Sequence, residues 1–249
     1  MKNHLTKVSL IVISITIFIA CNAKMSNKQS NPISTKSVYK SWHVLTKVEQ
    51  EQLTPELVLK EFKEGNERYK SGNVTQREHS EDTRRIATSG QFPKAMVLSC
   101  LDSRVPVEDV FDQGIGDVFV GRVAGNFVNT DLLGSMEFAC KVAGAKLIIV
   151  MGHQHCGAVK GAIDNVQLGN ITAMLQNIRP AVVKSENFPG EKSSKNEAYV
   201  KYVAENNIRN TINNIREKSE ILRVMEANGQ IKIVGVFYTL RTGTLEFIN

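Results

Sequence analysis

The chain has 249 residues, of which 42% are hydrophobic, so it is long enough to build one sizeable buried core with short appendages. Its 31 Lys and Arg residues outnumber its 25 Asp and Glu residues, which gives a formal net charge of +6. The basic residues are scattered along the chain and are not interleaved with aromatic residues, whereas nucleic-acid binding needs clustered positive charge. We therefore expect one globular domain and no nucleic-acid partner.

The first 20 residues have the pattern of a bacterial export signal. Lys2 and Lys7 form a short cationic region, and residues 8–20 are a mainly apolar run. As a helix this run would rise only about 20 Å, less than the roughly 30 Å of a membrane's hydrocarbon core, so a cleaved signal peptide is favoured over a spanning helix. Phe18-Ile-Ala-Cys21 is similar to the bacterial lipoprotein box, with Phe18 in place of the usual Leu. We expect lipidation of Cys21, and hence an exported lipoprotein, periplasmic or on the cell surface, that is held to the membrane by its N-terminal lipid.

Residues 21–52 are expected to hold the lipidated cysteine, a polar tether and an N-terminal arm. Residues 22 to about 40 are polar, with few large apolar side chains, which is the composition of a tether. About 20 such residues can reach on the order of 60 Å, enough to hold a domain clear of lipid head groups. Trp42, the only tryptophan, is followed by Val44 and Leu45, and these residues predict an arm that lies on the core.

Residues 53–249 are expected to form the globular domain, because strand and helix patterns alternate there. Thr54 and Pro55 are suited to begin a helix, and Gly72 to end it. Apolar runs predict strands at residues 96–99, 117–123, 146–151 and 231–238, and a final short run ends at 248. Helical periodicity covers residues 106–110, 130–143, 157–164, 171–184 and 196–228, the last range being broken, while 73–90 is a polar connection. This alternation predicts an α/β domain with a central, mostly parallel β-sheet flanked by helices, preceded by the N-terminal helical arm.

Two of the predicted strands end on residues that bind soft metals. Cys100 follows the strand at 96–99, and His153-Gln-His-Cys156 follows the strand at 146–151. In parallel sheets, ligands bind outside the carboxyl ends of the strands, so Cys100, His153 and Cys156 are expected to converge. Catalytic zinc takes three protein ligands and keeps a fourth position for water. The two motifs therefore predict one Zn²⁺ per subunit, whereas Cys140, inside an amphipathic helix, is expected to be only a small buried hydrophobe.

The segment from Gln91 to Asp164 closely resembles the β-class carbonic anhydrases. That family's signature is C-x-D-S-R, then a strand of the type F-V-x-R-x-A-N, then H-x-x-C-G, and a looser resemblance continues to the C-terminus, so it covers roughly residues 53–249. The departures are modest: Gly125 stands beside Asn126, and Ala158 stands where a second Gly is common. Neither departure removes a functional group.

The resemblance implies an enzyme, a carbonic anhydrase, which is a zinc lyase. Its reaction would be the reversible hydration of carbon dioxide to bicarbonate and a proton through a zinc-bound hydroxide. Cys100, His153 and Cys156 would be the zinc ligands, and Asp102 and Arg104 would be the catalytic dyad. Because the family builds its active sites at a dimer interface, the resemblance also implies a homodimer or a homotetramer.

The resemblance leaves two states of the zinc site open. In the open state Asp102 is held by Arg104 and orients the hydroxide, whereas in the closed state Asp102 itself binds zinc. The closed subgroup typically has Trp three positions before the first Cys and Gly immediately before it, and here these positions hold Val97 and Ser99. Gln91 falls where the constitutively open subgroup has a Gln that lines the substrate pocket. We therefore expect the open state, with Gln91 in the substrate pocket.

Other functions remain open at this point. A related lyase or hydrolase acting on carbon disulfide or carbonyl sulfide could keep the same metal ligands. A non-catalytic zinc-bearing surface lipoprotein, which would bind bicarbonate or a host ligand, has no need of the dyad formed by Asp102 and Arg104. His155 lies between two ligands and could shuttle protons, but a neighbour on a tight turn often points away. Export would expose the thiols to an oxidising compartment, and we expect no stable disulfide because zinc protects the two ligand thiolates.

Overall fold

The computed structural model describes residues 43–77 and 79–248. The proposed export signal, Cys21, the tether and Trp42 lie outside these residues, so the expectations about them stay predictions. Among the described residues, no helix combines the length and the apolar character needed to cross a membrane.

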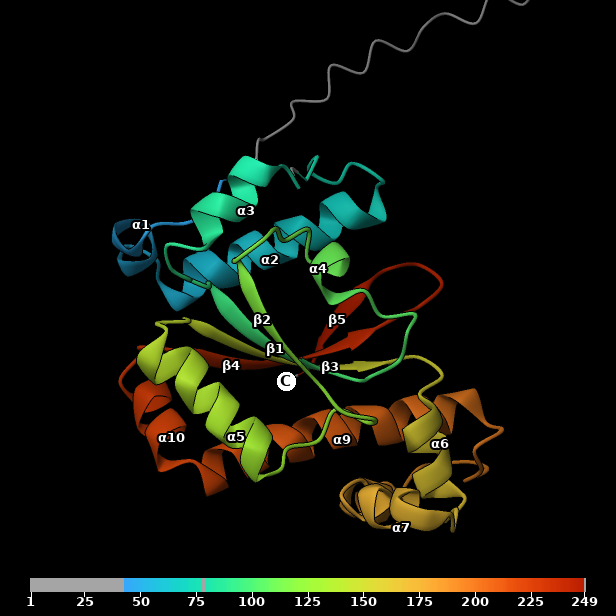
Figure 1. Cartoon of the computed structure of the whole chain (residues 1–249). Coiled ribbons are helices and arrows are strands. Elements are labelled where there is room, and N and C mark those ends of the chain that lie inside the picture. Colours follow the sequence, from blue (N-terminus) through green and yellow to red (C-terminus); the bar gives the residue numbers. More distant parts are fainter. Residues whose placement is uncertain (1–42, 78, 249) are drawn as a thin grey trace, which may run out of the picture. The chain divides into compact units, whose positions relative to one another are not determined.

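A five-stranded sheet with the strand order β2-β1-β3-β4-β5 forms the centre of the described chain (Figure 1). The first four strands of this order run parallel, and β5 pairs antiparallel with β4. The predicted α/β fold with a mostly parallel sheet is thereby confirmed. The bounds are β1 Ala95–Ser99, β2 Val118–Arg122, β3 Leu147–His153, β4 Lys232–Tyr238 and β5 Leu245–Ile248.

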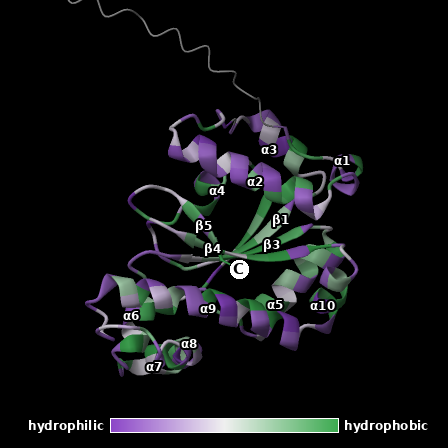
Figure 2. Cartoon of the chain, turned by 180° about the vertical axis from the view of Figure 1, so that it is seen from behind, coloured by the Kyte–Doolittle hydropathy of each residue, from purple (hydrophilic) through white to green (hydrophobic). Residues whose placement is uncertain are grey.

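Helices cover both faces of the sheet, and this explains why every residue of β1 and β3 is buried. Figure 1 shows α2 and α4 on one side of the sheet and α5, α9 and α10 on the other. In Figure 2, β1 and β3 carry the hydrophobic colour, whereas α2 is largely hydrophilic. The helices are α1 Lys47–Glu51, α2 Pro55–Lys70, α3 Glu81–Ala87, α4 Val107–Val110, α5 Thr130–Glu137, α6 Gly157–Ile163, α7 Gly169–Gln176, α8 Arg179–Lys184, α9 Glu197–Lys218 and α10 Glu220–Ala227, with a π-helical turn η1 at Phe138–Val142.

Helix α3 was not expected from the sequence, whereas α1 lies within the predicted N-terminal helical arm. Helix α3 lies inside the range predicted as a polar connection, and none of its residues is buried, so it has no apolar period that a sequence pattern could reveal. Helix α1 spans five residues, and only Gln50 in it is buried. The Gln50 side chain donates to the carbonyl oxygens of Pro93 and Ala143, at 2.7 Å each, and so holds the N-terminal arm on the core.

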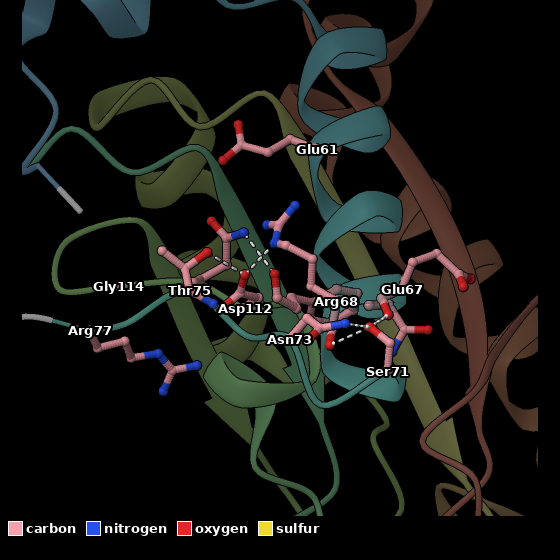
Figure 3. A network of polar contacts seen from close by, with 12 residues as sticks. Glu61, Glu67, Arg68, Ser71, Asn73, Thr75, Arg77, Asp112 and Gly114 are labelled. Atoms are coloured by element: carbon pink, nitrogen blue, oxygen red, sulfur yellow. Dashed lines mark hydrogen bonds and ion pairs between the residues drawn. The ribbon is translucent and has the colours of Figure 1, made fainter. Parts of the chain in front are cut away.

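The buried carboxylate of Asp112 links α2 to the segments beside it through hydrogen bonds (Figure 3). Asp112 is fully buried and accepts hydrogen bonds from Arg68 Nε at 2.5 Å and from the Thr75 hydroxyl at 2.7 Å. Its backbone has the left-handed φ of 51°. These bonds join the end of α2 and the connection after it to the end of α4, and α4 directly follows the loop that leaves β1. That loop carries the first of the predicted metal ligands.

Candidate metal centre

The two predicted ligand motifs meet because β1 and β3 are neighbours in the sheet. Cys100 directly follows β1, and His153 is the last residue of β3. The Sγ atoms of Cys100 and Cys156 lie 3.9 Å apart although 56 residues separate them in the chain. Together with a ring nitrogen of His153, all three donor atoms lie within 4.8 Å of one another, and all three residues are buried. Two sulfurs bound tetrahedrally to one zinc at 2.3 Å would be about 3.8 Å apart, so the sulfur spacing fits that ion.

The hydrogen bonding of His153 leaves one ring nitrogen for a metal. Nδ1 lies 2.9 Å from the carbonyl oxygen of Gln154 and therefore donates to it. This assigns the lone pair to Nε2, which is buried and has no hydrogen-bond partner among the described residues. A buried ring nitrogen without a partner needs an explanation, and a cation between the imidazole and the two sulfurs supplies one.

The turn between His153 and Cys156 directs the His155 side chain away from the donor cluster. His155 has a left-handed φ of 57°, and its Nδ1 lies 3.7 Å from a carboxylate oxygen of Glu197 at the start of α9. His155 is therefore not part of the donor cluster. Cys156 immediately precedes α6, and backbone N–H groups of the first turn of α6 donate to its sulfur. These donors lower the pKa of Cys156, but the hydrogen bond with Cys100 and burial of the sulfur outweigh them.

A hydrogen bond couples the two ligand thiols. The sulfurs of Cys100 and Cys156 are joined by a hydrogen bond, and this bond is the largest cause that lowers the pKa of Cys100. The same bond, together with burial, raises the pKa of Cys156 above its usual range. A second thiolate at this distance from the first is unfavourable unless a cation lies between them.

Asp102 and Arg104 form a tight pair beside the cluster. Arg104 donates from Nε to Oδ1 of Asp102 at 2.9 Å and from Nη2 to Oδ2 at 2.8 Å, and its backbone N–H also donates to Oδ1 at 2.9 Å. The guanidinium is the main cause that lowers the pKa of Asp102 to about 2, so the carboxylate is ionised at neutral pH. Asp102 Oδ2 lies 3.9 Å from His153 Nε2, so the carboxylate borders the space in front of the donor atoms.

Arg122 supports the same loop, a role that the sequence did not reveal. It is the last residue of β2, and its guanidinium donates to the carbonyl oxygens of Cys100 at 2.9 Å and Val105 at 2.7 Å. One side chain thereby holds both ends of the loop that contains Asp102 and Arg104. Arg122 lies within the strand motif shared with the resembled family. Its partners are backbone carbonyl groups, which every residue has, so the sequence could not identify them.

Two other predicted residues lie outside the donor cluster. Gln91 is exposed and precedes the amino end of β1, whereas Cys100 follows the carboxyl end, so one chain does not bring Gln91 to the metal ligands. Cys140 is 3% exposed in η1, and burial raises the pKa of its thiol to about 12. Cys100, Cys140 and Cys156, the cysteines of the described residues, are all free thiols.

Comparisons with known proteins agree with this geometry. The carbonic anhydrase family model matches residues 95–245. Carbonic anhydrase 2 of Mycobacterium tuberculosis is 34% identical over 194 residues, which are 76% of this chain and 90% of that protein. The structure of the β-carbonic anhydrase CcaA has a TM-score of 0.61 at 25% identity, and the match covers 77% of this chain and 91% of that chain. A tetrameric β-carbonic anhydrase of Sordaria macrospora has a TM-score of 0.60 at 22% identity, with 67% and 85% covered. The matched segment runs from the first residue of β1 to the first residue of β5 and contains both ligand loops, and the chain therefore belongs to the carbonic anhydrase family, in its β class.

Proposed function

We propose that this chain catalyses the reversible hydration of carbon dioxide to bicarbonate and a proton. The observation that carries the proposal is the convergence of Cys100, His153 and Cys156, at the spacing of a tetrahedral zinc site, beside a carboxylate held by an arginine. When bound there, Zn²⁺ would supply the Lewis acidity that turns a water molecule into a nucleophile near neutral pH.

The protein has to orient that nucleophile because two thiolates make the metal less acidic than three neutral imidazoles would. Asp102 is suited to this task, since an ionised carboxylate accepts a hydrogen bond and can fix the direction of the donor's lone pair. Arg104 uses two nitrogens to hold both carboxylate oxygens, so the carboxylate cannot rotate freely. We assign Asp102 as the orienting acceptor and Arg104 as the group that keeps it ionised and in place.

The same contacts support the open state of the site. In the closed state Asp102 would give one oxygen to zinc and would have to release part of its pairing with Arg104. Here both oxygens are engaged by Arg104, and Asp102 does not belong to the compact donor cluster. A crystal structure near pH 7 with an Asp102 oxygen about 2.0 Å from zinc would overturn this assignment.

Stopped-flow carbon dioxide hydration, measured together with zinc content, tests the proposed function. We expect activity that disappears on zinc removal and returns when one equivalent of zinc is added back. Cys140→Ser is a matched control, because it removes a thiol that lies outside the cluster and should change neither zinc content nor hydration rate. A zinc-loaded protein without activity at both pH 7 and pH 8.5 would instead be a metal-binding protein without this enzymatic function.

We also propose that the protein forms a homodimer, or a tetramer built from dimers, through the β2 edge of the sheet. Within the described part of the chain, strand β2 pairs with β1 alone, and Phe138 and Val142 in the neighbouring η1 are 47% and 71% exposed. Phe119 of β2 packs edge-on against Phe138 at 6.2 Å between ring centroids, which extends this apolar surface onto the sheet. Light scattering should show an oligomer for the parent chain and a lower mass for Phe138→Lys; equal masses would exclude this edge as the interface.

Gln91 can take its predicted place in the substrate pocket only if a partner subunit brings it there. A mixed oligomer of Gln91→Ala and Asp102→Asn chains distinguishes the two arrangements. If Gln91 serves the partner's site, both defects fall on one site of each mixed pair and the other site stays intact, so mixing should restore part of the activity. No gain on mixing would indicate that Gln91 has no role across subunits.

We propose, from the sequence, that the chain is exported and lipidated on Cys21. Mass spectrometry of the membrane fraction should find a diacylglycerol-modified N-terminal peptide that begins at Cys21. Cys21→Ser should release the protein from the membrane. A mature N-terminus at another residue, without lipid, would show ordinary cleavage instead.

A further inference from the structure

Asn207 is a fully buried asparagine in the middle of α9. Its neighbours one turn earlier, Val203 and Ala204, belong to the apolar core. Among the described residues its side chain makes one hydrogen bond, from Nδ2 to the carbonyl oxygen of Gly125 at 2.7 Å, while its Oδ1 has no partner. A buried amide oxygen without a partner lowers stability, so the asparagine needs a local reason. The bond that it does make lies next to the metal centre.

Gly125 lies in the turn that follows β2, and it approaches the first metal ligand. Its φ is 85°, a left-handed conformation that favours glycine, and a Cβ at this position would also overlap the end of the Ile178 side chain. In this conformation the backbone N–H of Gly125 donates to the sulfur of Cys100 at 3.4 Å. The glycine noted as a departure from the family pattern therefore places a peptide donor on a metal ligand.

Helix α9 holds this turn at two consecutive carbonyls. Thr211, four residues after Asn207 and hence on the same side of the helix, donates from its hydroxyl to the carbonyl oxygen of Asn126 at 3.2 Å. Glycine rotates more freely about φ and ψ than any other residue. Without these two bonds, Gly125 could turn its N–H away from the sulfur.

We propose that Asn207 and Thr211 are positioning residues of the metal centre, which hold the turn at residues 123–126 so that Gly125 donates a hydrogen bond to the metal-bound sulfur of Cys100. This inference rests on the proposed function, since it requires Cys100 to bind the metal. A thiolate that accepts a hydrogen bond donates less charge, so the metal stays more strongly Lewis acidic. The bond would thus offset part of the charge that two thiolates give to the metal.

The test uses the full-length protein loaded with Co²⁺, whose sulfur-to-cobalt charge-transfer band reports on the thiolates, together with the zinc dissociation constant from chelator competition. Asn207→Asp removes the donor and places a carboxylate against the Gly125 carbonyl, and Thr211→Val removes the second bond while keeping the side-chain shape. For both variants we expect the band to move to lower energy and the dissociation constant to rise 10- to 100-fold, the usual effect of losing a group that supports a metal ligand. Thr211→Ser, which keeps the hydroxyl, should restore the parent values.

Asn210→Asp is the matched control on the same helix. Asn210 is 8% exposed, and its Oδ1 accepts from Lys184 Nζ of α8 at 3.2 Å and not from the turn, so this variant should leave the band and the zinc affinity unchanged. If Asn207→Asp does not fold, the comparison of Thr211→Val with Thr211→Ser decides. If the parent binds metal and the variants have the same band and affinity as the parent, the positioning role is wrong but the proposed function stands. A parent that takes up neither Co²⁺ nor Zn²⁺ would overturn the proposed function and this inference with it.

Discussion

Zinc uptake at this site should release about one proton near neutral pH rather than two. We expect the metal-free pair to contain one thiolate, because the hydrogen bond between the two sulfurs lowers the pKa of Cys100. The same bond raises the pKa of Cys156, so Cys156 keeps its proton throughout the neutral range. Zinc binds both sulfurs as thiolates and therefore has to displace the Cys156 proton.

The sign and size of the pH dependence follow from this count. Higher pH favours loss of the Cys156 proton and hence zinc binding, whereas lower pH opposes it. One released proton makes the dissociation constant fall about tenfold per pH unit, so affinity should rise about 100-fold, or about 2.7 kcal/mol, between pH 7 and pH 9. The slope should stay constant over that interval because the pKa of Cys156 is raised beyond the pKa of an ordinary thiol.

Competition with a chelator of known zinc affinity at each pH measures the slope. Calorimetry in buffers of different ionisation enthalpy counts the released protons independently. Cys140→Ser should give the same slope, because burial already holds the pKa of Cys140 at about 12 and its sulfur is outside the cluster. Release of two protons per zinc at pH 7 would mean that both ligand thiols are protonated in the metal-free protein, and it would refute the expectation of one thiolate in the metal-free pair.

Three further predictions concern the loop that carries Asp102, the support of that loop by Arg122, and the packing around Gly65. Cys100→Ser should lose zinc, whereas Asp102→Asn should keep zinc but lose on the order of 10²- to 10⁴-fold in hydration rate; equal zinc loss in both would make Asp102 a metal ligand. Arg122→Met should retain one zinc per chain and lose about 10- to 100-fold in kcat/KM, because the loop that carries Asp102 is no longer held at both ends; an unchanged kcat/KM would contradict this support. Gly65→Ala should lower the free energy of unfolding by about 3 kcal/mol or more, since the added Cβ would overlap a backbone carbonyl oxygen. Gly134→Ala, also in a helix but with open space around the added Cβ, should instead raise the free energy of unfolding by about 0.5–1 kcal/mol; similar thermal shifts in the two variants would argue against the packing at Gly65.

Sequence reasoning located the donor cluster because its signals are local. Cys100 and His153 each lie where a short apolar strand ends, and parallel strands bring such ends to one edge of the sheet. Arg122 and Asn207 were missed for the opposite reason. Each donates to backbone carbonyl oxygens of a different segment, and a carbonyl group is present at every position whatever the residue.

Two other differences between the sequence-based predictions and the structure also have physical causes. The helix at 81–87 buries no residue, so its sequence has no apolar face to detect. Gln91 matches a family position by its offset from Cys100, yet the intervening strand separates the two within one chain. Sequence offset measures distance along the chain, and only the arrangement of subunits decides whether such a residue meets a site across an interface.

The side-by-side pairing of β1 with β3 also determines when during folding the metal can be captured. An unfolded chain offers His153 and Cys156 as neighbours, but the third donor, Cys100, is 56 residues away from Cys156, and closing so long a loop carries an entropic cost. A nascent chain therefore presents zinc with a weak two-donor fragment, and tight retention starts only after the two strands are in register. Metal capture should follow sheet formation in time, and a chain that mispairs these strands should remain without its ion.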